Sequence, residues 1–275
     1  MSTATLLRQA RLLRQKAELS RPAPSPILEA IRRDPAATMT MSGMQPDPWQ
    51  ESVLRSRALR QLLLCSRQAG KSSTAAALAL NTAFLEPGSL TLLLSPTLRQ
   101  SGELFREKVL RMWRKLGRPL MATRTTQLEL QLSNGSRIVS LPENEEGIRG
   151  FSSVAMLIID EASRVCDDLY RAVRPMLAVS GGRLVALSTP FGRRGWFFDE
   201  WERGSEWKRV RVTASQCPRI SQNFLDAEEK ALGERWFRQE YYCTFEESID
   251  AVFAAADVQA ALSGSIKPLF FGSKT

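Results

Sequence analysis

Short apolar runs alternate with helix-length amphipathic segments from residue 61 onward. The runs with the length of buried strands are Gln61–Cys65, Leu90–Ser95, Val154–Ile159 and Arg183–Ser188, and a further strand is expected at Trp207–Thr213. Strands separated by helices favour a parallel sheet with crossover connections. We therefore predict an α/β fold with a mostly parallel central sheet, followed by one helical segment at residues 224–242.

One pair of expected strands breaks the parallel pattern. Residues 127–132 and 136–141 are joined by Asn134-Gly135, a dipeptide that favours the tight turn of a β-hairpin. The sequence therefore predicts a hairpin inserted between the second and third strands of the parallel sheet.

Histidine is absent from the 275 residues. Its absence excludes triads that contain histidine, HNH-type nucleases and zinc sites that need an imidazole ligand, so the chemistry must use carboxylates, hydroxyls, Lys, Arg or a bound metal. Cys65, Cys166, Cys217 and Cys243 form no CxxC pair, and we expect reduced structural thiols of a cytosolic protein. No apolar run approaches the roughly 18 residues that a bilayer span needs, so no membrane contact is expected.

The net charge is +9, from 38 Lys and Arg against 29 Asp and Glu. This balance suits a polyanionic partner such as nucleic acid. Codon usage explains an excess of arginine equally well, so the charge alone does not decide the function.

The first 46 residues differ in composition from the rest. Residues 1–20 place leucine and alanine side chains at helical spacing between arginines, which predicts a basic amphipathic helix. We expect this helix to dock onto a partner or DNA, because it lacks the continuous apolar core of a secretory signal. Residues 21–48 are rich in proline and predict a linker with one short helix around Pro26–Arg33, so the folded body should begin near Asp47.

The strongest chemical signal follows the first expected strand. The segment reads Cys65-Ser66-Arg67-Gln68-Ala69-Gly70-Lys71-Ser72, and helix-forming residues 73–83 come after it. A phosphate loop needs inward backbone N–H groups, a lysine for the phosphates, a hydroxyl for magnesium and a helix N-terminus. Gly70, Lys71 and Ser72 supply the second half of G-x-x-x-x-G-K-[ST], whereas Cys65 replaces the first glycine. The strand before and the helix after favour a phosphate loop over a chance tripeptide.

Two further motifs end expected strands. The apolar run from residue 154 ends in Asp160 and Glu161, of which the first can hold the magnesium shell and the second can deprotonate an attacking water. The next strand ends in Ser188 and Thr189, small hydroxyls that could sense a γ-phosphate. Acidic residues and proline turns also follow strands in unrelated proteins, and it is the co-occurrence with the loop that favours function.

Together these motifs resemble the additional-glutamate branch of the P-loop NTPases, and in detail the ATPase domain of the large terminase subunit of tailed-virus DNA-packaging motors. The matching stretches are Pro48-Trp49-Gln50, Ser66–Ser72 with its internal arginine, Ile148-Arg149-Gly150-Phe151, Ile159-Asp160-Glu161-Ala162, Leu187-Ser188-Thr189-Pro190 and Gln239-Glu240-Tyr241-Tyr242-Cys243-Thr244-Phe245. The resemblance spans about residues 47–253. It implies a RecA-like P-loop NTPase fold with the inserted hairpin and a small C-terminal lid subdomain.

The resemblance also implies roles for individual residues. For nucleotide binding it implies Gln50 at the adenine, the loop residues Ser66, Arg67, Gln68, Ala69, Gly70, Lys71 and Ser72, and the coupling pair Ser188 and Thr189. Ser72 and Asp160 become ligands of Mg²⁺, and Glu161 becomes the catalytic base. The transition-state arginine is either Arg67 in cis or Arg149 in trans, and Arg149 is slightly favoured because flanking glycines give its loop reach.

The resemblance divides the chain into four parts. These are the amphipathic helix and linker (1–46), the P-loop ATPase core (47–206), the lid subdomain (207–253) and a C-terminal tail (254–275). Large subunits of this family normally continue into an RNase H-like nuclease, for which the tail is too short. We therefore expect no nuclease activity from this chain, whether it is a natural short form, a split gene product or a fragment.

The expected function is ATP hydrolysis that drives double-stranded DNA into a viral procapsid, with ATP and Mg²⁺ bound and a homo-oligomeric ring as the assembly. The resemblance also implies contacts with a portal protein, a small terminase subunit and a separate nuclease chain in the bacterial host cytoplasm. Two alternatives stay open: a helicase-like or other nucleic-acid-dependent ATPase, and a non-catalytic nucleotide-binding adaptor. Intact Lys71, Asp160 and Glu161 argue against the adaptor, because a decayed ATPase should lose one of them first.

Overall fold

The computed structural model describes residues 25–143, 148–247 and 261. Within these ranges, eight strands form one sheet in the order β3-β4-β5-β2-β6-β7-β1-β8. The strands are β1 (Arg60–Cys65), β2 (Leu90–Ser95), β3 (Ala122–Thr125), β4 (Glu129–Leu132), β5 (Arg137–Pro142), β6 (Met156–Asp160), β7 (Arg183–Ser188) and β8 (Lys208–Val212). Across the sheet, the neighbouring strands in the part β5-β2-β6-β7-β1-β8 are parallel. The pairs β3 with β4 and β4 with β5 are antiparallel. The α/β fold with a mostly parallel sheet is confirmed.

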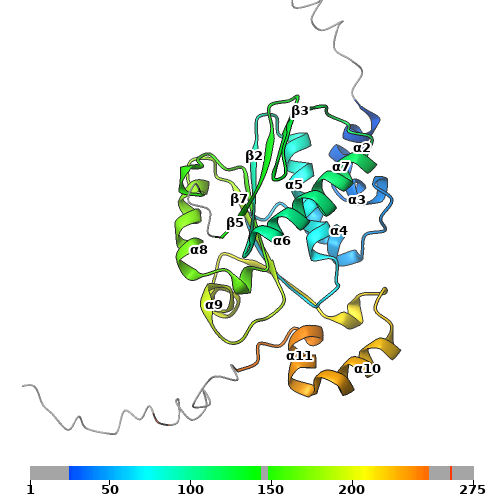
Figure 1. Ribbon diagram of the computed structural model, residues 1–275, viewed down its shortest axis with the longest axis vertical. Helices are drawn as coiled ribbons and strands as arrows, with labels where there is room; N and C mark the ends of the chain where they lie inside the picture. Colours follow the sequence, from blue (N-terminus) through cyan, green and yellow to red (C-terminus); the bar gives the residue numbers. More distant parts are fainter. Residues whose placement is uncertain (1–24, 144–147, 248–260, 262–275) are drawn as a thin grey trace, which may run out of the picture.

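Helices cover both faces of this sheet (Figure 1). One face carries α2 (Pro26–Arg33), α3 (Ala37–Met41), α4 (Pro48–Arg55), α5 (Lys71–Leu85), α6 (Leu98–Glu103), the π-helical segment η1 (Leu104–Leu110) and α7 (Arg111–Lys115). The other face carries α8 (Asp167–Val173) and α9 (Gly195–Arg203). In the described part of the chain, no helix combines the length and hydropathy needed to cross a bilayer.

The central strands are buried on both sides, so their sequences are continuously apolar instead of alternating. In β1, Leu63 belongs to the core beneath α5, whereas Leu62 and Leu64 belong to the core beneath α8 and α9. Helix α5 lies between the sheet and the N-terminal helices, and all but three of its residues are buried. Its run of alanines allows this close packing on two sides.

The N-terminal helices α2 and α3 belong to the folded body. Ile31 is 0% exposed and Met39 is 2% exposed, both in the core beneath α5. Asn81 of α5 donates from Nδ2 to the carbonyl oxygen of Pro35 at 2.9 Å. The short helix at Pro26–Arg33 matches its prediction. The expectation of a linker up to residue 46 is corrected for α2 and α3, because their apolar side chains are buried in the core. The predicted helix at 1–20 lies outside the described residues.

The C-terminal helical segment is two helices instead of one. α10 (Gln222–Leu232) and α11 (Glu234–Tyr242) meet at Gly233, whose φ of 77° ends the first helix. With a ψ of 156°, this positive-φ conformation is one that side chains disfavour and glycine adopts readily. Leu225, Phe237 and Tyr241 pack between the two helices, which lie beyond the edge of the sheet (Figure 1). The end of the expected lid subdomain and most of the tail lie outside the described residues.

The expected hairpin is β4 and β5, with Leu130 opposite Ile138. Its turn contains Gly135 at a φ of 84°, and Asn134 donates from Nδ2 to the carbonyl oxygen of Ala83 at 2.8 Å. Strand β3 was not predicted, because it is a polar edge strand with three exposed residues out of four. The four cysteines are free thiols, of which Cys166 is exposed and the other three are buried.

The packing of α2 predicts that Ile31→Ala lowers the free energy of unfolding by about 2–5 kcal/mol, since the change leaves a cavity in the core. Urea unfolding at equilibrium measures this loss. Leu59→Ala is the control, because Leu59 is 56% exposed and its truncation should cost less than about 0.5 kcal/mol. Equal stability of the two variants would show that α2 is not part of the folding unit.

Candidate functional site

Strands β1, β6 and β7 carry the three motifs to the same edge of the sheet. Because β7 pairs in parallel with both neighbours, Leu64 lies opposite Ser188 and Asp160 lies opposite Leu187. The carboxyl ends of parallel strands are where open α/β sheets bind ligands. The predicted phosphate loop, the acidic pair and the predicted coupling pair are therefore neighbours in space.

The loop between β1 and α5 has the shape of an anion site. Gly70 has a φ of 96° and Gln68 a φ of 60°, and α5 begins directly afterwards at Lys71. Lys71 is 7% exposed, and its Nζ donates to the carbonyl oxygen of Ser66 at 3.2 Å. The unpaired N–H groups of a helix N-terminus and a buried ammonium favour phosphate. Cys65 is the last residue of β1, where an extended backbone does not require glycine.

The outer side of the loop is held by two C-terminal elements. Ser66 donates its backbone N–H to Val212 of β8 at 2.8 Å, and Arg67 donates its backbone N–H to Glu240 of α11 at 2.9 Å. The Arg67 guanidinium also lies 3.7 Å from the Glu240 carboxylate, which is 9% exposed. The loop is thus attached to the sheet and to the two-helix subdomain.

Ser72 and the acidic pair meet across the sheet edge. Ser72 Oγ donates to Asp160 Oδ2 at 3.3 Å. Burial, together with the nearby charge of Glu161, raises the pKa of Asp160 to about 6. Glu161 has a left-handed backbone with φ 51° and ψ 43°. Such a conformation costs a non-glycine residue about 1–2 kcal/mol, and strain of this kind clusters at functional sites.

A cavity of about 260 Å³ lies over the loop, and its lining includes Lys71, Ser72, Arg67 and Glu161. Lys108 also lines it, from the π-helical segment η1. Sequence reasoning missed Lys108, because no motif surrounds it. Interruptions of α-helix by π-helix are frequent at functional sites, but their sequence signal is weak.

The coupling pair contacts the segment that carries Glu161. Ser163 Oγ donates to the carbonyl oxygen of Thr189 at 2.7 Å, and the backbone N–H of Ser163 donates to Ser188 Oγ at 3.1 Å. Ser163 was missed, although its position two residues after Glu161 was the available signal. The end of β7 is therefore hydrogen-bonded directly to the segment that carries Glu161.

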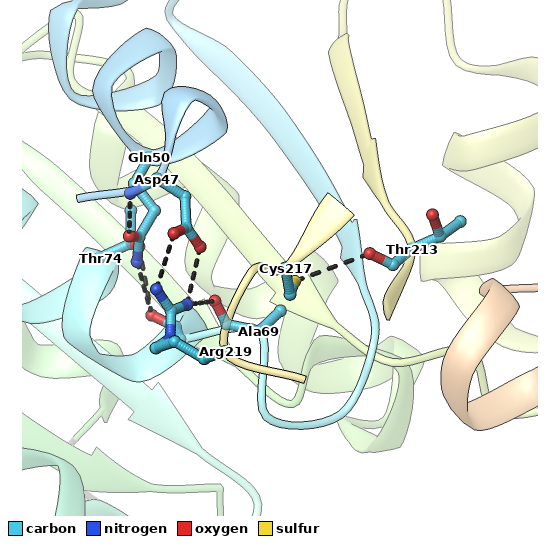
Figure 2. A network of polar contacts seen from close by, with 8 residues as sticks. Asp47, Gln50, Ala69, Thr74, Thr213, Cys217 and Arg219 are labelled. Atoms are coloured by element: carbon cyan, nitrogen blue, oxygen red, sulfur yellow. Dashed lines mark hydrogen bonds and ion pairs between the residues drawn. The ribbon is translucent and has the colours of Figure 1, made fainter. Parts of the chain in front are cut away.

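Gln50 lies on the other side of the loop (Figure 2). Its Nε2 donates to the carbonyl oxygen of Gly70 at 3.3 Å and to Thr74 Oγ1 at 3.0 Å. Its Oε1 accepts from the backbone N–H of Asp47 at 2.8 Å. A cavity of about 500 Å³ opens beside it, and its lining includes Met39, Met44, Pro46, Pro218 and Arg219. None of these lining residues was predicted, because their only signal is tertiary proximity.

The two arginine candidates differ in what the structure describes. Arg67 lies on the loop, with its side chain 68% exposed. The backbone of Arg149 forms the 3-10 turn Ile148–Gly150, with Ile148 buried. The side chain of Arg149 and the neighbouring Gly147 lie outside the described residues. The structure therefore brings Arg67 to the phosphate loop, and the expectation for Arg149 stays a prediction.

The raised pKa of Asp160 predicts a pH-dependent cost to stability. The folded state holds this proton more tightly than the unfolded state, so stability falls as the pH rises from about 4 to about 6. Without divalent cations or nucleotide, Asp160→Asn should be more stable than wild type at pH 7.5, by roughly 2–3 kcal/mol, and the gain should shrink at pH 4. Urea unfolding at both pH values checks this. The exposed Asp168→Asn is the control, and a gain that is equal at both pH values would contradict the prediction.

Comparison with known proteins gives matches to one family. The profile of the family described as Terminase large subunit, T4likevirus-type, N-terminal, matches residues 62–260. The large terminase subunit of Thermus virus P23-45 is 26% identical over 253 residues, which covers 78% of this chain and 52% of that protein. A second match, from Thermus phage G20c, has the same identity and coverage. The chain thus spans about half the length of the curated relatives it matches.

Solved structures show the same fold. The large terminase ATPase domain of Thermus phage P74-26 superposes with a TM-score of 0.67 at 21% identity, over 76% of this chain and 97% of that one. The large terminase of a thermophilic bacteriophage, solved with ADP, superposes with a TM-score of 0.61 at 14% identity, over 73% of this chain and 54% of that one. The fold is RecA-like, as expected, and the resemblance drawn from the motifs is confirmed. The profile covers most of the sequence, and the chain therefore belongs to the terminase large subunit family, in its T4likevirus-type N-terminal region.

Proposed function

We propose that this chain is the ATPase of a DNA-packaging motor, which hydrolyses ATP and couples hydrolysis to the movement of double-stranded DNA into a viral procapsid. The observation that carries the proposal is the contact of Ser72 Oγ with Asp160 Oδ2 at 3.3 Å. It joins the phosphate loop to the acidic strand, beside a cavity that Lys71 and Glu161 also line. Family membership supports the packaging role.

The loop residues 66–70 and the N-terminus of α5 bind the phosphates. Lys71 is already buried beside the loop, where its Nζ donates to the Ser66 carbonyl oxygen. In the nucleotide complex its ammonium turns to the β- and γ-phosphates and neutralises their charge. The N–H groups at the start of α5 stabilise the same charge.

Ser72 and Asp160 fit a magnesium ion. Their oxygen atoms are adjacent, and Mg²⁺ takes few protein ligands besides water and phosphate oxygens. With a pKa of about 6, Asp160 is ionised at neutral pH, as a metal ligand must be. When bound, the ion supplies additional positive charge to the phosphates.

Glu161 is the catalytic base. Glu161 lines the cavity over the loop, where its carboxylate orients a water molecule and takes its proton. The water oxygen bonds to the γ-phosphorus while the bond from that phosphorus to the bridging oxygen of ADP breaks. Ser188 and Thr189 hold the segment after Glu161 through Ser163, and they transmit the presence of the γ-phosphate to the rest of the sheet.

Gln50 selects adenine. Both hydrogens of its Nε2 are used by Gly70 and Thr74, whereas its Oε1 accepts one hydrogen bond from Asp47 and can accept one more. The amino group of adenine can donate to this oxygen, whereas guanine presents a carbonyl oxygen there. The cavity of about 500 Å³ beside Gln50 is large enough for a purine.

An arginine completes the site, as Arg67 of the same subunit or Arg149 of a neighbour in a ring. The ring, the portal protein, the small terminase subunit and a separate nuclease chain are the partners that family membership favours. The DNA contact is made to phosphates by the basic surface, since the chain carries a net charge of +9.

Lys71→Ala should abolish hydrolysis and weaken ATP binding, whereas Glu161→Gln should keep ATP bound and reduce turnover about 100-fold or more, because only the base is lost. DNA-stimulated phosphate release and equilibrium nucleotide binding measure the two effects. Lys230→Ala and Glu229→Gln, on α10, are matched controls. Turnover at the wild-type rate in Glu161→Gln would remove Glu161 as the base, and a wild-type protein without DNA-stimulated hydrolysis would refute the proposed function.

Mixing two inactive variants decides between the arginines. Arg149→Ala lacks the finger and Lys71→Ala lacks a working loop, so mixed rings contain some interfaces with both intact. If Arg149 acts in trans, hydrolysis recovers in part. Phosphate release after mixing, with co-assembly checked by light scattering, measures this. No recovery in confirmed mixed rings would favour Arg67.

A further inference from the structure

Arg219 reaches the phosphate loop from the connection between β8 and α10 (Figure 2). Its Nη1 and Nη2 donate to the two carboxylate oxygens of Asp47 at 2.6 and 2.7 Å. The same Nη2 donates to the carbonyl oxygen of Ala69 at 3.1 Å. Nothing in the sequence around residue 219 indicates a role in binding.

The contact with Ala69 fixes the direction of a peptide group. In a trans peptide, the carbonyl oxygen of one residue and the N–H of the next point in opposite directions. A donor that holds the Ala69 oxygen on the Arg219 side therefore points the Gly70 N–H away from Arg219. A phosphate loop needs its N–H groups on the ligand side and hence its carbonyl groups on the outer side.

The same guanidinium also controls the base side. The Asp47 side chain is 6% exposed, so its charge must be paired to be tolerated. The backbone N–H of Asp47 holds the amide of Gln50, which in turn donates to the Gly70 carbonyl oxygen. The Ala69 carbonyl oxygen thus accepts from Arg219 itself. The next carbonyl oxygen, of Gly70, accepts from Gln50, which Arg219 holds in place through Asp47.

The crowding around Gly70 agrees with this arrangement. A Cβ atom on Gly70 would lie 2.9 Å from Gln50 Nε2 and 3.5 Å from Arg219 Nη2. The Gln50 amide is therefore too close to the loop backbone for a Cβ atom there unless the amide shifts, whereas Arg219 Nη2 would be in ordinary van der Waals contact with it. The loop between β1 and α5 contains this one glycine, so its shape depends on outside contacts more than that of a glycine-rich loop.

We propose that Arg219 is a positioning residue for the phosphate loop, which it holds with the Gly70 N–H directed at the phosphates while it keeps Asp47 and Gln50 in place at the base. The proposal rests on the proposed function, because it assumes that the loop binds a nucleotide. It also means that the connection between the sheet and the two-helix subdomain bears directly on the affinity for phosphate.

Arg219→Lys tests the proposal. A lysine keeps the positive charge beside Asp47, but one ammonium cannot reproduce the planar fork that spans Asp47 and Ala69. In a Glu161→Gln background that prevents turnover, the dissociation constants for ATP and for inorganic tripolyphosphate should both rise about tenfold or more. In the wild-type background, KM for ATP should rise by a similar factor while kcat changes less than about threefold.

Arg55→Lys is the matched control. Arg55 also donates from two nitrogen atoms to the two carboxylate oxygens of one residue, Asp34, at 2.9 and 2.8 Å. Its side chain is 49% exposed, and that of Arg219 is 48% exposed. It does not line either cavity described here. Its substitution should leave both dissociation constants within about twofold of wild type, because only its exposed ion pairs with Asp34 and Glu51 change.

Tripolyphosphate separates the loop from the base site, because it has no base. Unchanged tripolyphosphate affinity in Arg219→Lys would overturn the proposal, even if ATP bound more weakly.

Asp47→Asn provides a second test that does not need Arg219 to be replaced. It leaves Arg219 able to donate to Ala69, so tripolyphosphate affinity should change less than about threefold. A loss as large as that expected for Arg219→Lys would also overturn the proposal, whereas failure of the wild-type protein to bind ATP would refute the proposed function instead.

Discussion

The parallel pairing of β7 with β1 on one side and β6 on the other is the constraint on which the site depends. It places the ends of β1 and β6 two strand spacings apart, about 10 Å. Ser72 on α5 and Asp160 at the end of β6 bridge this distance with a hydrogen bond. An antiparallel β7 would have carried Ser188 to the opposite edge, and Ser163, in the segment after Glu161, would have lost its hydrogen bonds to Ser188 and Thr189.

Much of the fold could be predicted because the central strands are buried on both faces and therefore have uninterrupted apolar sequences. β2 and β7 have the predicted bounds. The differences arise where burial is one-sided or absent. β3 is a polar edge strand, Gly233 divides a helix whose flanks have ordinary helical composition, and α2 is buried by contacts with α5 that local composition does not reveal.

The site could be predicted only as far as its chemistry follows from short motifs. Lys71, Ser72, Asp160 and Glu161 each lie at or shortly after the end of a strand, within a recognisable motif, so the topology brings them together. Ser163 and Arg219 act by hydrogen-bonding to backbone carbonyl groups. A carbonyl group is present at every residue, so such a contact leaves no characteristic residue pair in the sequence. Only the tertiary structure shows which carbonyl each side chain reaches.

The left-handed backbone of Glu161 has a consequence for how this protein can evolve. Asparagine and glycine adopt that conformation with less strain, so selection for heat resistance alone favours them at position 161. Selection for turnover retains the carboxylate that we propose as the catalytic base. The two pressures act in opposite directions on one residue, so the identity of residue 161 records which of them has prevailed in a given lineage.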